Sequence, residues 1–127
     1  MMDINNLKYI NDTYGHKNGD QYIKGCCRVL SKNCKMSPIY RVGGDEFVVI
    51  LQGADYANRK KIFEQLKDSY REYYNDASRQ PWERYSASIG MSQIQDNDAK
   101  ISDVFSRADG EMYKAKSEFR LKNGQYR

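Results

Sequence analysis

The sequence predicts an α/β (α+β) fold in which helices cover a mostly antiparallel sheet. Two short runs rich in β-branched and aromatic residues, 38–42 and 46–51, flank the Gly43-Gly44-Asp45 turn, and this arrangement is a hairpin signal. Residues 85–92 alternate apolar and small polar side chains, as a strand does. Elsewhere apolar residues recur at helical spacing, so the same chain is expected to form both sheet and helices.

Two helices are expected before the hairpin. Residues 5–14 carry apolar side chains at helical spacing and end at Gly15, which predicts a short helix followed by a turn. After the next glycine, Asp20 is a candidate N-cap for a second helix that runs to about residue 31. His16 falls in the turn between the two glycines, where we interpret it as a structural residue.

Two more helices are expected after the hairpin. Asp55 is a candidate N-cap for a long helix whose apolar positions follow the 3.6-residue period and which ends near residue 75. The last helix carries a regular apolar stripe that we expect to pack in the core. The stripe consists of Ile101, Phe105, Ala108, Met112 and Ala115.

Size and composition indicate an ordinary folded protein. The 127 residues suit one domain, which we place at residues 1–127, and 39% hydrophobic with 30% charged residues is typical of a globular chain. No apolar run approaches the ~20 residues that cross a bilayer, and the N-terminus lacks the basic and apolar regions of a signal peptide. We therefore expect a cytoplasmic location and no membrane contact.

The charge balance and the cysteines narrow the class of ligand. A net charge of +4 favours an anionic ligand such as a nucleotide, but it does not choose between GTP and nucleic acid. Cys26, Cys27 and Cys34 form no C-x-x-C pair and His16 is the only histidine, so a zinc site lacks ligands. We expect reduced thiols, some of which pack as small hydrophobic groups.

The turn at Gly43-Gly44 is the first candidate for chemistry. Its glycines let the backbone approach a ligand closely and adopt positive φ, while Asp45 and Glu46 place two carboxylates at the hairpin tip. Mg²⁺ bound by one or two carboxylates and completed by substrate phosphates is a common arrangement for phosphoryl and nucleotidyl transfer. By itself the motif is equally consistent with a tight turn and nothing more.

Asp3 is the second candidate. It lies just before the first expected helix, whose N-terminal N–H groups and partial positive charge suit a triphosphate near residues 6–8, beside a metal ion held by Asp3. The alternative is that Asp3 only caps that helix.

Five segments, in order over nearly the whole chain, resemble the GGDEF family of diguanylate cyclases. They are residues 3–12, Gly15-His16 with Gly19-Asp20, 41–47, 88–90, and 108–109 with 112–116. The resemblance implies a palm-like nucleotide cyclase fold that binds GTP with Mg²⁺ or Mn²⁺ and condenses two GTP into cyclic di-GMP. It also implies a homodimer in which each domain holds one GTP.

The resemblance also implies an acidic centre. The metal ligands would be the carboxylates of Asp3, Asp45 and Glu46. The backbone carbonyl of Ile4 would assist them. Asp45 and Glu46 would be the catalytic acids, with Glu46 placed near the metal and the 3′-hydroxyl as ligand or general base. The signature loop is completed by Gly43, Gly44 and Phe47.

Further residues match the family's nucleotide contacts. Asn11 and Asp20 match the positions that read guanine, and without the resemblance they are a helix-end residue and an N-cap. Lys116 and Arg120 match a basic pair on the phosphates, and otherwise they are ordinary cations at a helix C-terminus. Arg41 is either one more charge near the phosphates or a surface residue of a strand. The full set of implied phosphate contacts is Leu7, Lys8, Lys116 and Arg120.

The chain also departs from the family pattern. The family places a helix and a complete central strand ahead of the position of Asp3, where this chain offers only Met1-Met2. We therefore expect a piece of a longer protein with an upstream sensor domain. It should lack the usual first helix and most of the first strand. This loss would expose apolar helix faces and unpaired backbone groups, unless another chain supplies the missing element.

Three smaller differences concern single motifs. Residues 34–37 lack the R-x-x-D motif of product inhibition, so no inhibitory site is expected. Asn5 and Leu7 replace a frequent acid and an aromatic residue of the first motif. Phe119 replaces a glycine, which leaves the placement of Arg120 open.

Three functions stay open at this point. The first is an active enzyme that condenses GTP, and the second is a catalytically inactive GGDEF piece that acts as a GTP-binding or dimerisation module. The third, a basic nucleic-acid binder, rests on charge alone, and we expect no nucleic-acid partner.

Overall fold

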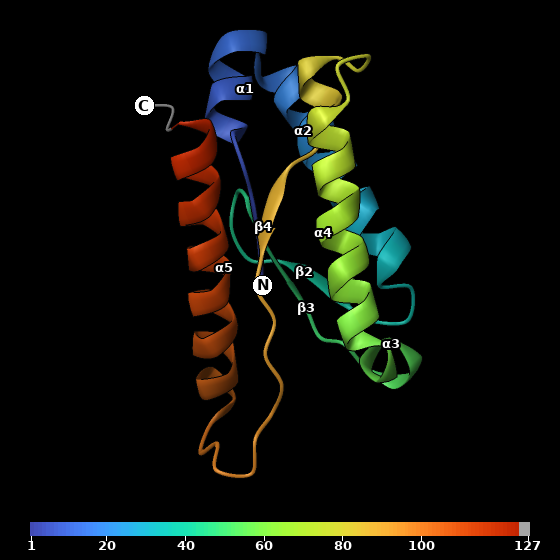
Figure 1. Cartoon of the computed structure of the whole chain (residues 1–127), viewed down its shortest axis with the longest axis vertical. Coiled ribbons are helices and arrows are strands. Elements are labelled where there is room, and N and C mark those ends of the chain that lie inside the picture. Colours follow the sequence, from blue (N-terminus) through green and yellow to red (C-terminus); the bar gives the residue numbers. More distant parts are fainter. Residues whose placement is uncertain (125–127) are drawn as a thin grey trace.

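The computed structural model describes residues 1–124 and shows helices packed on a four-stranded sheet (Figure 1). The strands are β1 (Met2–Ile4), β2 (Ile39–Arg41), β3 (Glu46–Val49) and β4 (Ala87–Ile89). The helices are α1 (Leu7–Tyr14), α2 (His16–Asn33), α3 (Gly53–Ala57), α4 (Arg59–Asn75) and α5 (Ile101–Asn123), with a 3₁₀ turn at Pro81–Glu83. All three strand pairs are antiparallel, in the order β2-β3-β1-β4, so the predicted fold class is confirmed.

β1 is the element that the predicted order of helices and strands missed. It lies in the middle of the sheet, where Met2 faces Phe47 of β3 on one side and Ile89 of β4 on the other. A three-residue strand is too short to show the alternation that identifies longer strands, and the sequence expectation therefore began with a helix. Met2 and Ile4 are almost fully buried.

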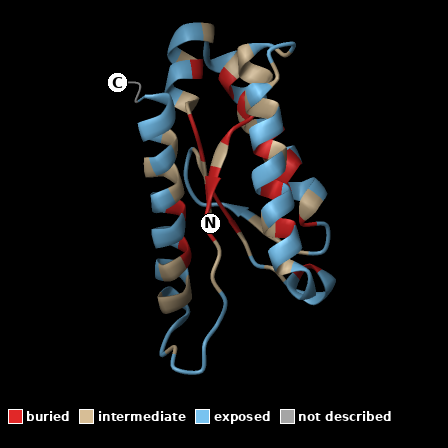
Figure 2. Ribbon diagram, in the orientation of Figure 1, coloured by how far each residue is buried: buried red, intermediate tan, exposed pale blue. Residues whose placement is uncertain are grey.

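The two faces of the sheet are covered differently. α2 and α4 lie on one side and α5 on the other, and the buried residues concentrate on the strands and the inner faces of the helices (Figures 1 and 2). On the first side, Tyr70 of α4 donates a hydrogen bond to the backbone oxygen of Cys26 of α2 at 2.8 Å, which links the two helices. On the other side, α5 packs so closely on Gly90 that a Cβ there would lie 2.2 Å from the backbone oxygen of Ala108.

The structure corrects the start of the second helix. α2 begins at His16, so His16 is a helical residue and Asp20 lies one turn inside the helix instead of capping it. The turn between α1 and α2 is the single residue Gly15, with φ of 89°, a value that glycine adopts without steric cost. Because one glycine is enough to redirect the chain, the helix starts five residues earlier than the cap rule predicts.

The third expected helix is interrupted. α3 and α4 are separate helices joined at Asn58, and Asp55 lies within α3. The Asp55 carboxylate accepts hydrogen bonds from the Met36 backbone N–H at 2.8 Å and from the Ser37 hydroxyl at 2.7 Å. Asp55 thus ties α3 to the loop before β2, and the prediction that it caps a long helix was wrong.

The apolar stripe of α5 is core only in its second half. Ala108 and Met112 are buried, whereas Ile101 is 63% exposed and Phe105 is 38% exposed. β4 ends at Ile89, and among residues 1–124 no strand follows it to cover the first turns of α5. The expectation of core packing was therefore wrong for those two residues.

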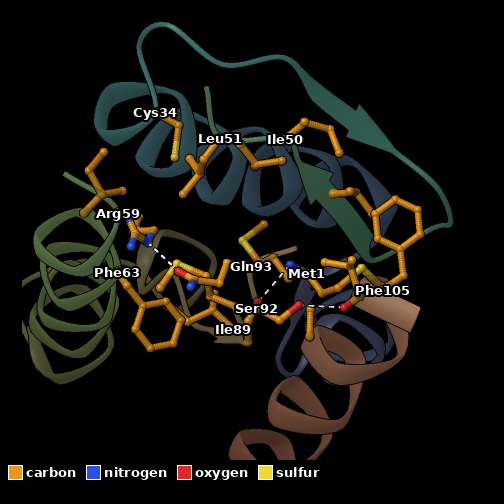
Figure 3. A pocket seen from close by; sticks show the side chains of 18 of the residues that line it. Met1, Cys34, Ile50, Leu51, Arg59, Phe63, Ile89, Ser92, Gln93 and Phe105 are labelled. Atoms are coloured by element: carbon orange, nitrogen blue, oxygen red, sulfur yellow. Dashed lines mark hydrogen bonds between the residues drawn. The ribbon is translucent and has the colours of Figure 1, made fainter. Parts of the chain in front are cut away.

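An apolar groove opens beyond the N-terminal end of β1 (Figure 3). Met1 closes the ladder, since its amino group donates to the Gly90 oxygen at 3.0 Å and its oxygen accepts from the Gly90 N–H at 2.9 Å. Past this point the groove holds about 190 Å³ and is bordered by Leu51, Phe63 and Phe105.

The cysteines behave as packing residues. Cys26, Cys27 and Cys34 are free thiols, and Cys26 and Cys34 are buried. Burial raises the pKa of Cys26 to about 12 and the pKa of Cys34 to about 11, so both thiols are protonated at neutral pH.

Within residues 1–124, none of the helices combines the length and the apolar character needed to cross a membrane.

We predict that Gly90→Ala destabilises the fold by about 2 kcal/mol or more, because the new Cβ would meet backbone atoms of α5 that cannot move aside. Gly110→Ala is the matched control, since Gly110 is an exposed glycine of α5 where a Cβ meets nothing within 4 Å. That change should be neutral or stabilising by about 0.5–1 kcal/mol. Urea unfolding measures both, and equal effects of the two substitutions would contradict the close packing.

The ion pair between Asp98 and Arg107 gives a pH-dependent prediction. Two Arg107 nitrogens lie 2.6 and 2.8 Å from the Asp98 oxygens, and these contacts, with the Gln95 N–H, lower the pKa of Asp98 to about 2. An ordinary carboxyl has a pKa of about 3.9, so Asp98 contributes its full stabilisation above pH ~4 and loses it as the pH falls towards 2. The difference in unfolding free energy between the wild type and Asp98→Asn should shrink over that range, and a constant difference would refute this role.

Candidate functional site

Three acidic residues gather where β1 meets the hairpin. Asp3 faces Glu46 across the β1–β3 ladder, and residues opposed in this way project from the same side of the sheet. The Ile4 N–H donates to the Asp45 backbone oxygen at 2.8 Å, which fixes the hairpin tip beside β1. The Asp45 carboxylate is close enough to raise the pKa of Asp3.

Asp3 is held in a tightly enclosed, charged setting. Its side chain is 14% exposed, and its Oδ1 lies 2.9 Å from the ammonium nitrogen of Lys116, whose side chain is also 14% exposed. Burial raises the pKa of Asp3, contact with the Lys116 ammonium opposes that rise, and the Asp45 charge adds to it. Asp3 sits inside β1 and the N-cap of α1 is Asn6, so the alternative that Asp3 caps this helix is wrong.

The β1–α1 connection is anchored by a residue that the sequence analysis noted only as a departure. Asn5 is 2% exposed, donates to the Ser86 hydroxyl at 3.0 Å and accepts from the Ser88 hydroxyl at 2.9 Å. The Tyr22 hydroxyl donates to its backbone oxygen at 2.7 Å. These bonds fix the end of β1, after which Asn6, with φ of 65°, turns the chain into α1. In the sequence, the alternation of Ser86 and Ser88 before and within β4 was the signal that could have indicated a polar partner for Asn5.

A cleft lies between this connection and the C-terminal part of α5. It holds about 190 Å³. Its lining residues are Ile4, Asn5, Asn6, Leu7, Lys8, Tyr9, Asp45, Lys116, Phe119, Arg120 and Gly124. All four predicted phosphate contacts are therefore brought together, beside two of the predicted metal ligands. Phe119 packs edge-on against Tyr74, with ring centroids 5.3 Å apart, and the next residue, Arg120, lines the cleft.

The predicted guanine residues lie together on a different surface. Asn11 of α1 is half-buried against α2, because a Cβ added at Gly19 would lie 1.7 Å from its Oδ1. Asp20 follows Gly19 on α2 and is exposed. Neither residue lines the cleft, so the predicted guanine residues lie apart from the predicted phosphate residues.

The hairpin tip differs in detail from what its glycines suggested. Neither Gly43 nor Gly44 has positive φ, so their predicted role in a left-handed turn was wrong. The turn is instead held by Arg41, whose guanidinium donates to the Gly43 oxygen at 3.2 Å and to the Gly44 oxygen at 2.7 Å. A Cβ at Gly44 would meet nothing within 4 Å, so the space beside the tip is open. Phe47 is a core residue, 4% exposed.

The acidic centre fits a cation that also takes ligands from a substrate. Among residues 1–124, no group of three His, Cys, Asp or Glu side chains could hold a metal ion by itself. However, Asp3 Oδ1 is buried and, within the same residues, accepts no hydrogen bond of good geometry. Mg²⁺ is usually bound by one or two carboxylates and completed by water and phosphate oxygens. Asp3, Asp45 and the Ile4 carbonyl suit that kind of site.

Comparisons with known proteins identify the family of this chain. Residues 1–122 match the family model described as "Diguanylate cyclase, GGDEF domain". The chain is 32% identical over 124 residues to the "Probable diguanylate cyclase DgcT" of Escherichia coli (strain K12). The match covers 96% of this chain and 27% of that protein, so the chain spans about a quarter of this relative's length.

Solved structures show the same fold. An active GGEEF domain of a diguanylate cyclase from Vibrio cholerae superposes with a TM-score of 0.73 at 27% identity, over 92% of this chain and 74% of that one. The GGDEF domain of DgcB from Caulobacter crescentus, solved with c-di-GMP, gives 0.72 at 24% identity, over 92% and 70% of the two chains. Since the family model matches almost the whole sequence, this chain belongs to the GGDEF family of diguanylate cyclase domains.

Proposed function

We propose that this domain condenses two GTP molecules into cyclic di-GMP by Mg²⁺- or Mn²⁺-dependent nucleotidyl transfer in a homodimer. The observation that carries the proposal is that Asp3 meets Asp45 and Lys116, from segments up to 113 residues apart, and that Asp45 and Lys116 line one cleft. Acidic groups for a cation and basic groups for a triphosphate lie side by side there. The family relationship supplies the reaction class.

The cleft would hold the triphosphate. Lys116 and Arg120 project from successive turns of α5 and supply positive charge. Leu7 and Lys8 begin α1, and the amides at a helix N-terminus favour phosphate oxygens. Asn11 and Asp20 would pair with the edge of guanine, because an amide and a carboxylate together match its acceptor and donor groups.

Asp3, Asp45, Glu46 and the Ile4 carbonyl would hold the cation. When bound, Mg²⁺ or Mn²⁺ neutralises charge on the phosphates and favours ionisation of a nearby hydroxyl. Glu46 would accept the proton of the 3′-hydroxyl as its oxygen attacks the α-phosphorus of the other GTP. The bond from the α-phosphorus to the bridging oxygen breaks, and pyrophosphate leaves. Two such steps give the cyclic product and two pyrophosphates.

The proposed homodimer follows from the stoichiometry of the reaction. One domain holds one GTP, and each 3′-hydroxyl must reach the α-phosphate of the other nucleotide. Two domains facing each other in antiparallel fashion satisfy both attacks by one symmetry operation. A cytoplasmic location and an upstream sensor domain in a longer protein remain part of the proposal.

A non-catalytic GTP-binding or dimerisation module is the second candidate. It is favoured by the short β1, because Asp3 depends on a three-residue strand next to an open apolar groove. A catalytic carboxylate needs rigid support from its surroundings. GTP-dependent thermal stabilisation without turnover would favour this candidate over the enzyme.

We predict that Asp45→Ala and Glu46→Gln each lower the rate of cyclic di-GMP formation by about 10²-fold or more, because each removes an acidic group from the reacting centre. Chromatographic product analysis with GTP and Mg²⁺ or Mn²⁺ measures the rate. Glu111→Gln is the control, since Glu111 is exposed on α5 and pairs with Lys114. Full activity of the first two variants would exclude the proposed roles.

A second prediction concerns base selection. Inosine triphosphate lacks the 2-amino group of guanine, so the wild type should favour GTP over it. Asp20→Asn should narrow that preference by about tenfold, mainly through KM, because it removes a charged acceptor. Gln21→Ala changes the exposed neighbour and should leave the preference intact. An unchanged preference in Asp20→Asn would place guanine elsewhere.

A further inference from the structure

The Lys116 ammonium occupies the position expected for a cation. Its nitrogen lies 2.9 Å from Asp3 Oδ1 and donates a hydrogen bond to the Ile4 backbone oxygen at 3.1 Å. These two oxygens are among the proposed metal ligands. Lys116 reaches them from α5, across the face of the sheet opposite α2 and α4.

This contact answers an electrostatic problem in the acidic centre. Asp3 is largely buried and has the Asp45 carboxylate beside it, and both conditions oppose its ionised form. A buried carboxylate needs an opposite charge close by, and the ammonium supplies one. Asp3 Oδ1 nevertheless lacks a hydrogen bond of good geometry within residues 1–124, so the lysine balances the charge without satisfying the oxygen fully.

A metal ion and the ammonium cannot both take these oxygens. Mg²⁺ binds its oxygen ligands at about 2.1 Å, so an ion on Asp3 and the Ile4 carbonyl must enter the space that Lys116 holds. Two positive charges at this separation also repel each other strongly. The lysine side chain has a flexible four-carbon stem, and it can leave without movement of α5.

The same cleft offers Lys116 a second position. Arg120, one turn further along α5, and Leu7 at the start of α1 line the cleft with it. A triphosphate bound there would present anionic oxygens to the ammonium. The lysine would then release Asp3 and the Ile4 carbonyl at the moment when the phosphates also provide metal ligands.

We propose that Lys116 holds the cation position while the cleft lacks nucleotide, and that it moves to the phosphates when a nucleoside triphosphate binds. This inference rests on the proposed function for the identity of the two ligands. Metal and nucleotide binding are then coupled through one side chain. By linkage, each ligand must tighten the other by the same factor, typically about 5- to 150-fold.

Binding of Mn²⁺, followed by electron paramagnetic resonance of the free ion, tests the coupling without turnover. The wild type should bind Mn²⁺ weakly alone and at least about tenfold more tightly with a non-hydrolysable GTP analogue. Lys116→Met should bind Mn²⁺ alone about tenfold more tightly than the wild type. The increase in Mn²⁺ affinity that the analogue causes should be smaller in this variant than in the wild type. Asp3→Asn should lose the tight site in every case.

Two controls separate displacement from a general effect of charge. Arg120→Met removes a positive charge from the same cleft. It should weaken binding of the GTP analogue and leave the affinity for Mn²⁺ alone nearly unchanged. Lys114→Met removes an exposed charge of α5 and should change neither affinity. If Arg120→Met strengthens Mn²⁺ binding as much as Lys116→Met does, the charge alone matters and the inference is overturned.

The remaining outcomes of the Mn²⁺ titrations also support or overturn the inference. Equal Mn²⁺ affinity of the wild type with and without the analogue overturns the inference, and this measurement needs no variant. If Lys116→Met does not fold, Lys116→Gln takes its place, and an unchanged affinity for Mn²⁺ alone in the folded variant is equally adverse. Coupled binding without GTP turnover would support the inference and count against the enzyme. GTP turnover without coupled binding would support the enzyme and overturn the inference.

Discussion

The pairing of β1 with both of its neighbours is the constraint on which the rest of the structure depends. The three residues of β1 join β3 to β4. Met2 and Ile4 are buried in the core, and Asp3 lies on the opposite face of the sheet. The same pairing fixes the hairpin tip beside Asp3, through the bond from Ile4 to Asp45. A shift of one residue in this register would turn Asp3 into the core, so fold and site are specified together.

The electrostatics of the site follow from that placement. A carboxylate in the middle of a sheet is poorly hydrated, and the protein balances it with Lys116 from the last helix. The bond of Lys116 to the Ile4 oxygen makes α5 a partner of β1 as well as a cover for the sheet. Removal of Lys116 would leave Asp3 buried without a counter-charge, which is costly unless a metal ion replaces it.

Much of this arrangement could be predicted from the sequence, because the informative residues form short motifs with a strict order. The hairpin around Gly43 and the helical spacing of α5 identified the fold class, and the family motifs selected the four predicted phosphate residues that the structure brings to one cleft. What could not be predicted depends on contacts distant in sequence. The anchoring of Asn5 by Ser86 and Ser88, and the exposure of Phe105, are set by where strands end and not by local pattern.

A crystal structure with Mn²⁺ and a non-hydrolysable GTP analogue tests the central claim most directly. The account predicts an anomalous manganese signal on Asp3 and the Ile4 oxygen, the triphosphate in the cleft beside Arg120, and the Lys116 ammonium on the phosphates. It also predicts guanine between Asn11 and Asp20. Nucleotide bound elsewhere, or Lys116 still on Asp3 with the cleft filled, would contradict it.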